Sequence, residues 1–112
     1  MRSTAPIAFF AYNRPKHTQC LLESLMQNER ADQSELFIFC DSAKKPEDEE
    51  SVEQVRALVR SQQWCAKVHI VEQKCNVGLA DSIISGVTDI CQKYGRVIVL
   101  EDDLVLSPYF LD

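Results

Sequence analysis

Short apolar runs alternate along this chain with longer segments in which apolar residues recur every three or four positions. The short runs are rich in β-branched and aromatic residues and are too short for helices, so we predict a buried strand at each. They cover residues 7–12, 36–40, 68–71 and 97–100. Strands that are almost entirely apolar and alternate with helices predict a parallel sheet covered on both faces.

The longer segments are predicted to be helices. The first opens at Pro15, because proline is tolerated in a first helical turn. The second opens at Pro46, and we expect the acidic run 47–50 after it to be a solvated first turn at the positive end of the helix dipole. The third covers about 79–94, where Gly95 is a favourable stop. The apolar stripes comprise Leu21, Leu22, Leu25 and Met26 in the first helix, Val52, Val55, Leu58 and Val59 in the second, and Leu79, Ile83, Ile84, Val87, Ile90, Cys91 and Tyr94 in the third.

Composition agrees with one globular domain over residues 1–112. Hydrophobic residues make up 46% and charged residues 26% of the chain, which excludes a disordered tail, a collagen-like repeat and a coiled coil. The formal charge of −5 argues against nucleic-acid binding through bulk electrostatics. No apolar run approaches the roughly 18 to 20 residues of a membrane span. The pattern therefore predicts a three-layer α/β/α domain with a mainly parallel sheet.

Cysteine usage points to a reducing compartment. The chain has 5 cysteines, no CxxC pair and isolated histidines, so it predicts neither a disulfide framework nor a zinc site. Buried free thiols in the cytoplasm are the simplest interpretation, although Cys75 falls in a predicted loop.

Near the C-terminus of the sequence, Ser107-Pro108 looks like a helix start with few residues after it. We therefore expect the natural protein to continue beyond Asp112, which makes this chain part of a longer one.

Polar residues follow every predicted strand, at the edge where an open parallel sheet binds ligands. Tyr12 can offer its ring to a base or can cap the core, and Arg14 can meet a phosphate or simply begin a helix. Asp41 can accept a hydrogen bond from a ligand or form an Asx-turn. Asn76 belongs to a turn and is also a possible ligand contact. The residue pattern leaves each of these alternatives open.

Three consecutive carboxylates, Glu101, Asp102 and Asp103, directly follow the fourth predicted strand. Their like charges repel one another unless a cation offsets them. A hard divalent ion such as Mn²⁺ or Mg²⁺ binds one or two carboxylates together with substrate phosphate oxygens. The segment therefore indicates a metal site, with a solvated acidic turn as the alternative.

Together these segments resemble the nucleotide-sugar-binding, N-terminal half of a GT-A glycosyltransferase with a Rossmann-like fold. The similarity is to the inverting family 2 group and to the Golgi N-acetylglucosaminyltransferase I type, and the acidic segment resembles their DxD-type motif. The segments that carry the resemblance are IAFFAYNRP at 7–15, LFIFCDS at 36–42, NVGLADSI at 76–83 and VIVLEDDLVLSPYF at 97–110.

The resemblance implies a role for each residue of the acidic segment. Asp103 is expected to bind the metal that bridges the diphosphate of a nucleotide-diphospho-sugar, while Glu101 and Asp102 hold the ribose and a metal-bound water. The metal then acts as a Lewis acid that stabilises the leaving nucleoside diphosphate as an acceptor hydroxyl attacks. The general base of such enzymes lies downstream of the motif, so this chain is expected to bind a hexosyl or N-acetylhexosaminyl donor without turnover.

The same resemblance implies that Asp41 bonds the nucleobase, that Tyr12 and Arg14 line the base and ribose-phosphate pocket, and that Asn76 contacts the substrate. The acceptor, whether saccharide, lipid or protein, is left open. Nucleotide-sugar supply indicates the cytoplasm, with the inner face of a membrane as a second expectation.

The sequence leaves three rival interpretations open. A receiver-like signalling module needs an acidic pair after the first strand, where this chain has Asn13-Arg14. A sugar nucleotidyltransferase usually carries a glycine-rich basic loop there, and AYNRPKH contains no glycine. The third rival is a structural domain with a solvated acidic edge.

Overall fold

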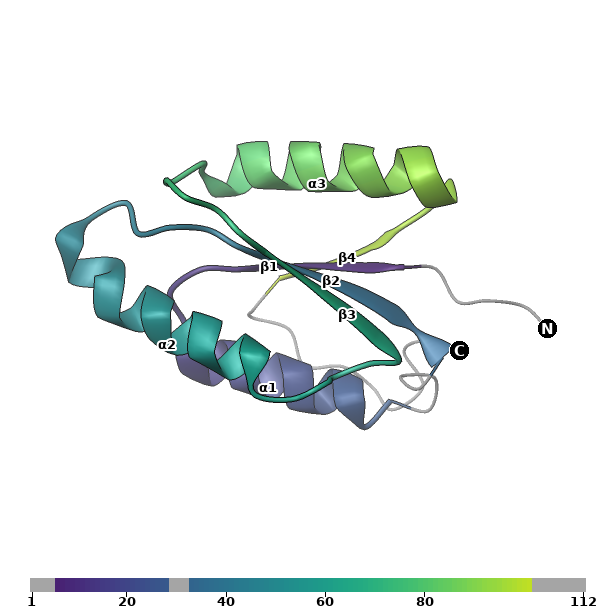
Figure 1. Cartoon of the computed structure of the whole chain (residues 1–112), viewed down its shortest axis with the longest axis horizontal. Coiled ribbons are helices and arrows are strands. Elements are labelled where there is room, and N and C mark those ends of the chain that lie inside the picture. The colour runs from purple at the N-terminus through teal and green to yellow at the C-terminus, as the bar shows by residue number, and fades with distance from the viewer. Residues whose placement is uncertain (1–5, 29–32, 102–112) are drawn as a thin grey trace.

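The computed structural model describes residues 6–28 and 33–101, which form one alternating β/α chain (Figure 1). Every predicted strand and helix is confirmed, and the strand boundaries shift by one residue. The second helix, predicted to open at Pro46, begins there as a 3-10 turn and becomes α-helical only at Glu49. The elements are β1 (Ile7–Ala11), α1 (Pro15–Met26), β2 (Glu35–Cys40), the 3-10 helix η2 (Pro46–Asp48), α2 (Glu49–Arg60), β3 (Lys67–Glu72), α3 (Leu79–Tyr94) and β4 (Ile98–Glu101).

The sheet is parallel throughout its described strands, in the order β3-β2-β1-β4. Helices α1 and α2 cover one face and α3 covers the other, so the predicted three-layer α/β/α architecture is confirmed (Figure 1). The chain moves outward from β1 to β3 with its helices on one face. It then returns through α3 to place β4 on the far side of β1, which reverses the strand order between β1 and β4.

This strand order also separates two α/β architectures. Receiver and flavodoxin-like domains place β1 between β2 and β3, whereas Rossmann-like domains place β1 between β2 and β4. Here β1 pairs with β2 and with β4. The topology is therefore Rossmann-like, and the receiver-like alternative is wrong for this fold.

The face beneath α1 and α2 holds the larger core. Alternate residues of β1 and β2 point into it, among them Phe9 and Ile38, which have no exposed surface. Trp64 closes the core beneath the α2–β3 loop, where it is 1% exposed and donates its indole N–H to the carbonyl of Val59 at 3.1 Å. The buried members of this cluster are Ile7, Phe9, Ala11, Leu21, Leu22, Leu25, Leu36, Ile38, Cys40, Val55, Val59, Trp64, Cys65 and Leu100.

On the other face, α3 packs closely because Gly86 faces the sheet without a side chain. A Cβ at Gly86 would lie 3.0 Å from the ring tip of Phe39 and 3.1 Å from that of Phe10. These two rings stack with their centroids 5.0 Å apart. At its end α3 stops at Gly95, as predicted, where a positive φ of 79° suits glycine and the Gly95 N–H bonds the carbonyl of Cys91 at 2.8 Å.

Some residues placed in the apolar stripes are exposed, which corrects the sequence prediction. Met26 is 38% exposed, Tyr94 44% and Ile84 66%. They lie at the ends or flanks of their helices, beyond the width of sheet that each helix covers. Strand β3 is also less covered than predicted: it is the outer strand of the described sheet, and Ile70 and Val71 are exposed.

The thiols are free, and they divide by environment. Cys40 and Cys65 are buried as predicted, and burial raises the pKa of each to about 12. Cys75 is exposed in its loop, but Cys20 is exposed as well, because it lies on the outer face of α1; the expectation of burial was wrong there. None of the helices in the described ranges has the length and apolar character needed to cross a bilayer.

Candidate functional site at the carboxyl end of the sheet

The carboxyl ends of all four described strands lie at one edge of the sheet. Tyr12 follows β1, Asp41 follows β2 and Gln73 follows β3, while β4 ends at Glu101. Pairing places Glu101 opposite Phe10, next to the point where Tyr12 leaves β1. In open α/β sheets, the crevice at such a reversal of strand order is where ligands bind.

The first loop is fixed by a carboxylate from the second. Asp48, at the end of η2, accepts hydrogen bonds from the Tyr12 hydroxyl at 3.0 Å and from the Asn13 amide at 3.2 Å. The Tyr12 oxygen in turn accepts the backbone N–H of Lys44 at 2.9 Å. Both partners of the Tyr12 hydroxyl lie between β2 and α2, so the phenol ties the loop after β1 to the segment after β2.

The environment of Tyr12 keeps its hydroxyl protonated. Partial burial raises its pKa above the ordinary value of 10.0, and Asp48 raises it further through the hydrogen bond and its charge. The Lys44 N–H opposes both effects. Tyr12 is therefore a neutral hydrogen-bond donor at neutral pH.

Asp41 ties the end of β2 to the loop before α3. Its Oδ1 accepts the N–H groups of Ser42 at 2.9 Å and Val77 at 2.8 Å. Its Oδ2 accepts the Gly78 N–H at 2.9 Å and the Asn76 side-chain amide at 3.2 Å. Gly78 has a φ of 91°, which disfavours other residue types at this turn. Asp41 and Asn76, predicted separately from the sequence, thus form one cluster.

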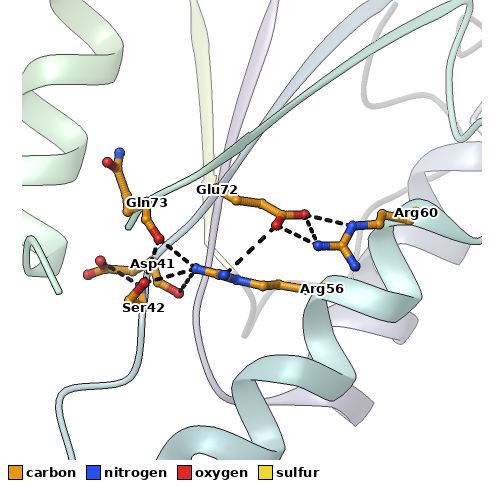
Figure 2. A network of polar contacts seen from close by, with 6 residues as sticks. All are labelled: Asp41, Ser42, Arg56, Arg60, Glu72 and Gln73. Carbon is orange, nitrogen blue, oxygen red and sulfur yellow. Dashed lines mark hydrogen bonds and ion pairs between the residues drawn. The ribbon is translucent and has the colours of Figure 1, made fainter. Parts of the chain in front are cut away.

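A third side chain, Arg56 of α2, joins the ends of β2 and β3 (Figure 2). Its Nη2 donates to the Gln73 carbonyl at 2.9 Å, to Ser42 Oγ at 3.0 Å and to the Asp41 carbonyl at 3.3 Å. Ser42 Oγ also donates to the Gln73 carbonyl. Glu72 lies 3.8 Å from Arg56 Nη1 and forms a paired hydrogen bond with Arg60.

The remaining predicted site residues lie as follows. Arg14 is exposed just before α1, and Glu101 ends β4. Asp102 and Asp103 lie outside the described residues. Carboxylate oxygens such as those of the acidic segment suit Mn²⁺ or Mg²⁺, and β4 ends at Glu101 beside the strand-order reversal. Among the residues that the structure describes, no group of three or more histidines, cysteines and carboxylates could hold a metal ion.

Sequence reasoning missed Asp48 and Arg56. Asp48 was interpreted as part of a solvated turn; its neighbours Glu47, Glu49 and Glu50 are indeed exposed, but Asp48 is half-buried against Tyr12. No local signal distinguishes it, because its partner lies 36 positions away. Arg56 did carry a signal: it falls four residues after Val52, on the apolar side of α2, and a charge there implies a buried partner.

A hollow of about 430 Å³ lies elsewhere, at the amino end of β3. Its walls come from the end of α2 and the start of β3 and include Arg60, Lys67 and Ile70. The hollow shares Arg60 with the network of Figure 2 but contains none of the strand-end residues. It is therefore distinct from the candidate site.

No protein-family profile and no curated protein matches this chain. Solved structures do. TarS from S. aureus is similar with a TM-score of 0.64 and 12% identity, over 95% of this chain and 18% of TarS. The mannosyltransferase PcManGT from Pyrobaculum calidifontis, in complex with GDP-Man and Mn²⁺, is similar with a TM-score of 0.64 and 15% identity, over 94% of this chain and 29% of that protein.

These similarities define the class of fold. The match to the mannosyltransferase covers nearly the full length of this chain. The chain therefore has a glycosyltransferase-like, Rossmann-like fold. At such low identity the likeness concerns the fold alone. The chain also spans less than a third of the length of the solved structures that it matches.

Proposed function

We propose that the chain is the donor-binding part of a GT-A glycosyltransferase and binds a nucleotide-diphospho-sugar together with a divalent metal. The observation that carries the proposal is the position at which β4 ends. Glu101, the last residue of β4 and the first of the acidic segment, lies opposite Phe10 at the reversal of strand order, beside the end of β1 that leads to Tyr12. The mannosyltransferase with a similar fold is in complex with GDP-Man and Mn²⁺, which supports the proposal.

In this proposal the base lies against Tyr12, whose ring is held by Asp48. Asp41 accepts an N–H of the base on Oδ2. The Asn76 amide makes the longest of the four hydrogen bonds to Asp41, at 3.2 Å, and has a second acceptor in the Ser42 carbonyl at 2.9 Å. Asn76 can therefore yield its place on Oδ2 to a base without losing every partner. Arg14, exposed at the start of α1, is placed to meet a phosphate.

Glu101, Asp102 and Asp103 supply the carboxylates, with Asp103 as the metal ligand and the other two toward the ribose and a bound water. When bound, Mn²⁺ or Mg²⁺ neutralises the charge that develops on the leaving diphosphate. We place the general base and the acceptor site in a part of the protein beyond residue 112, so donor binding is the activity expected here. The sugar is a hexose or an N-acetylhexosamine, and the free thiols favour the cytoplasm.

Thermal unfolding with UDP, GDP, ADP and CDP, each with and without Mn²⁺, tests this proposal. Linkage predicts a stabilisation of about 2.7 kcal/mol at a hundredfold excess over Kd, which raises Tm by several degrees for a domain of this size. We expect a metal-dependent rise with one nucleotide that disappears in Asp103→Asn and persists in Asp89→Asn, an exposed control on α3. No rise with any nucleotide, or an equal rise in Asp103→Asn, would contradict the proposed function.

A further inference from the structure

We infer that Arg56 is a positioning residue that holds Asp41 and its loop in the geometry that a nucleobase requires. This inference rests on the proposed function and extends it to a residue outside the ligand contacts. Arg56 belongs to α2, and its side chain extends from the helix to the residues that follow β2 and β3 (Figure 2).

Two of the three acceptors of Arg56 are backbone carbonyls at the base of the two loops, and the third is Ser42 Oγ. Its Nη2 bonds the carbonyl of Asp41, the residue whose carboxylate accepts the Val77 and Gly78 N–H groups. The same nitrogen bonds the carbonyl of Gln73, where the loop toward α3 begins. One guanidinium therefore bridges the same two chain segments that the Asp41 carboxylate also joins.

The burial of Arg56 points to a specific role rather than a surface one. Its side chain is only 13% exposed, and its Nε has no hydrogen-bond acceptor within the described ranges. Burying a charge with an unpaired donor costs free energy of desolvation, so the burial of Arg56 is weak evidence that the residue serves stability. Glu72, 3.8 Å away, offsets the charge. The arrangement fits a residue kept for geometry, because the guanidinium reaches three acceptors at two strand ends.

Arg60 provides a matched comparison one helical turn further along α2. It shares the partner Glu72, but its side chain is 52% exposed, and among the described residues its hydrogen bonds go to Glu72 alone. Arg60→Gln removes the ion pair with Glu72 and leaves the contacts to the Asp41 and Gln73 carbonyls in place. Arg56→Gln removes those contacts.

The first arm of the test needs no ligand. Amide hydrogen exchange at Val77 and Gly78 is measured in the wild type, Arg56→Gln, Ser42→Ala and Arg60→Gln. We expect exchange at both amides to accelerate about tenfold in Arg56→Gln and less in Ser42→Ala, with no change in Arg60→Gln. Ser42→Ala deletes only one hydroxyl of the network, so it keeps the test valid if Arg56→Gln fails to fold. Unchanged exchange in the folded variants would overturn the inference.

The second arm compares two probes in the presence of Mn²⁺: inorganic pyrophosphate and whichever nucleoside diphosphate the wild type binds. Arg56→Gln is expected to raise Kd about tenfold for the nucleoside diphosphate and to leave Kd for pyrophosphate within about twofold. Arg56→Lys, with the charge but a shorter reach, should recover part of the loss. A merely structural role would weaken both probes alike or leave both unchanged, and either result overturns the inference. If the wild type binds no nucleoside diphosphate, the proposed function falls and this role falls with it.

Discussion

The two ends of the sheet are held together in different ways. At the carboxyl end, Asp41 and Arg56 bind backbone N–H and C=O groups of the loops. At the amino end, side chains bind one another on the surface: Glu35 accepts a hydrogen bond from the Tyr94 hydroxyl at 3.0 Å and pairs with His69, while the rings of Phe37 and His69 stack. The contacts at the carboxyl end fix the path of the backbone, whereas those at the amino end join side chains on the surface without bonding the loop backbone.

This difference indicates that the loop conformation is fixed at the carboxyl end of the sheet. Polar groups that bind loop backbone pre-organise a site, since they lower the ordering cost that a ligand would otherwise meet. Ion pairs between exposed side chains contribute little and are screened by salt. The fixed loops lie at the same carboxyl edge of the sheet as the reversal of strand order between β1 and β4, so topology and local bonding point to the same end of the molecule.

The largest expected effect is the pH dependence of stability that comes from two buried thiols, and it tests whether water is excluded from the core equally at both ends of the sheet. Cys40 lies at the carboxyl end and Cys65 precedes β3 at the amino end; burial raises both thiol pKa values from 9.0 to about 12. Because the folded pKa lies above the unfolded one, the stabilisation is complete below pH 9.0 and is lost as the pH rises toward 12. Each thiol should remove about 1.4 kcal/mol per pH unit in that window.

Urea unfolding between about pH 8 and about pH 11 measures this loss. The free energy of unfolding of the wild type relative to Cys40→Ala, and relative to Cys65→Ala, should stay constant below pH 9.0 and fall by about 1.4 kcal/mol per pH unit above it. A curve for Cys40→Ala that stays parallel to the wild type would mean that water reaches the core at the carboxyl end. The two ends would then differ in the hydration of the core as well as in how their loops are held.

A smaller effect is expected from the carboxylate that fixes the loop before α3. Asp41→Asn replaces an ionised acceptor of four hydrogen bonds by an amide that can accept at one oxygen only. We expect a loss of about 2 kcal/mol in the free energy of unfolding, since hydrogen bonds to charged groups contribute about 1.5 to 3 kcal/mol each and part is recovered by solvent. Urea denaturation beside Asp89→Asn, the exposed control, measures it. Equal stabilities would show that Asp41 does not hold the loop.

The smallest effect is expected at the amino end. The hydrogen bond to Glu35 is the main cause that raises the pKa of Tyr94 above 10.0, followed by burial. Glu35→Gln should therefore lower the Tyr94 pKa toward its ordinary value, with no measurable change in the urea midpoint. Phenol absorbance during an alkaline titration reports it, and Tyr94→Phe assigns the transition. Tyr12, whose pKa is raised chiefly by burial, should titrate as before; a shift at Tyr12 would contradict the separation of the two ends.

Most of the fold could be predicted because the signals are local. Strands and helices follow from runs and spacings within a few residues, and Gly95 marks the end of α3 by its own conformational freedom. The stripes went wrong at Met26, Ile84 and Tyr94. Periodicity reports which side of a helix is apolar, but it does not report how wide a strip of sheet that side meets.

The site could be predicted only in part. The location of the candidate site follows from the alternation of strands and helices, which shows in the sequence which residues follow each strand. Tyr12, Asp41 and Asn76 were predicted on that basis. Their partners were not, because Tyr12 meets Asp48 across 36 positions and Arg56 meets the Gln73 carbonyl across 17. Such pairs depend on how α2 sits over the sheet, which no local pattern encodes. Arg56 was recognisable as a buried charge, but its acceptors were not.

The most direct test of the central claim uses the paramagnetism of Mn²⁺. The two ends of a five-residue strand such as β1 lie about 17 Å apart, so a bound ion broadens amide signals at one end far more than at the other. With Mn²⁺ and the preferred nucleoside diphosphate present, we predict loss of the signals of Tyr12, Asn13 and Glu101, while those of Glu35 and Lys67 persist. Broadening centred on Glu35 and Lys67, or no selective broadening, would contradict a donor site at the carboxyl end of the sheet.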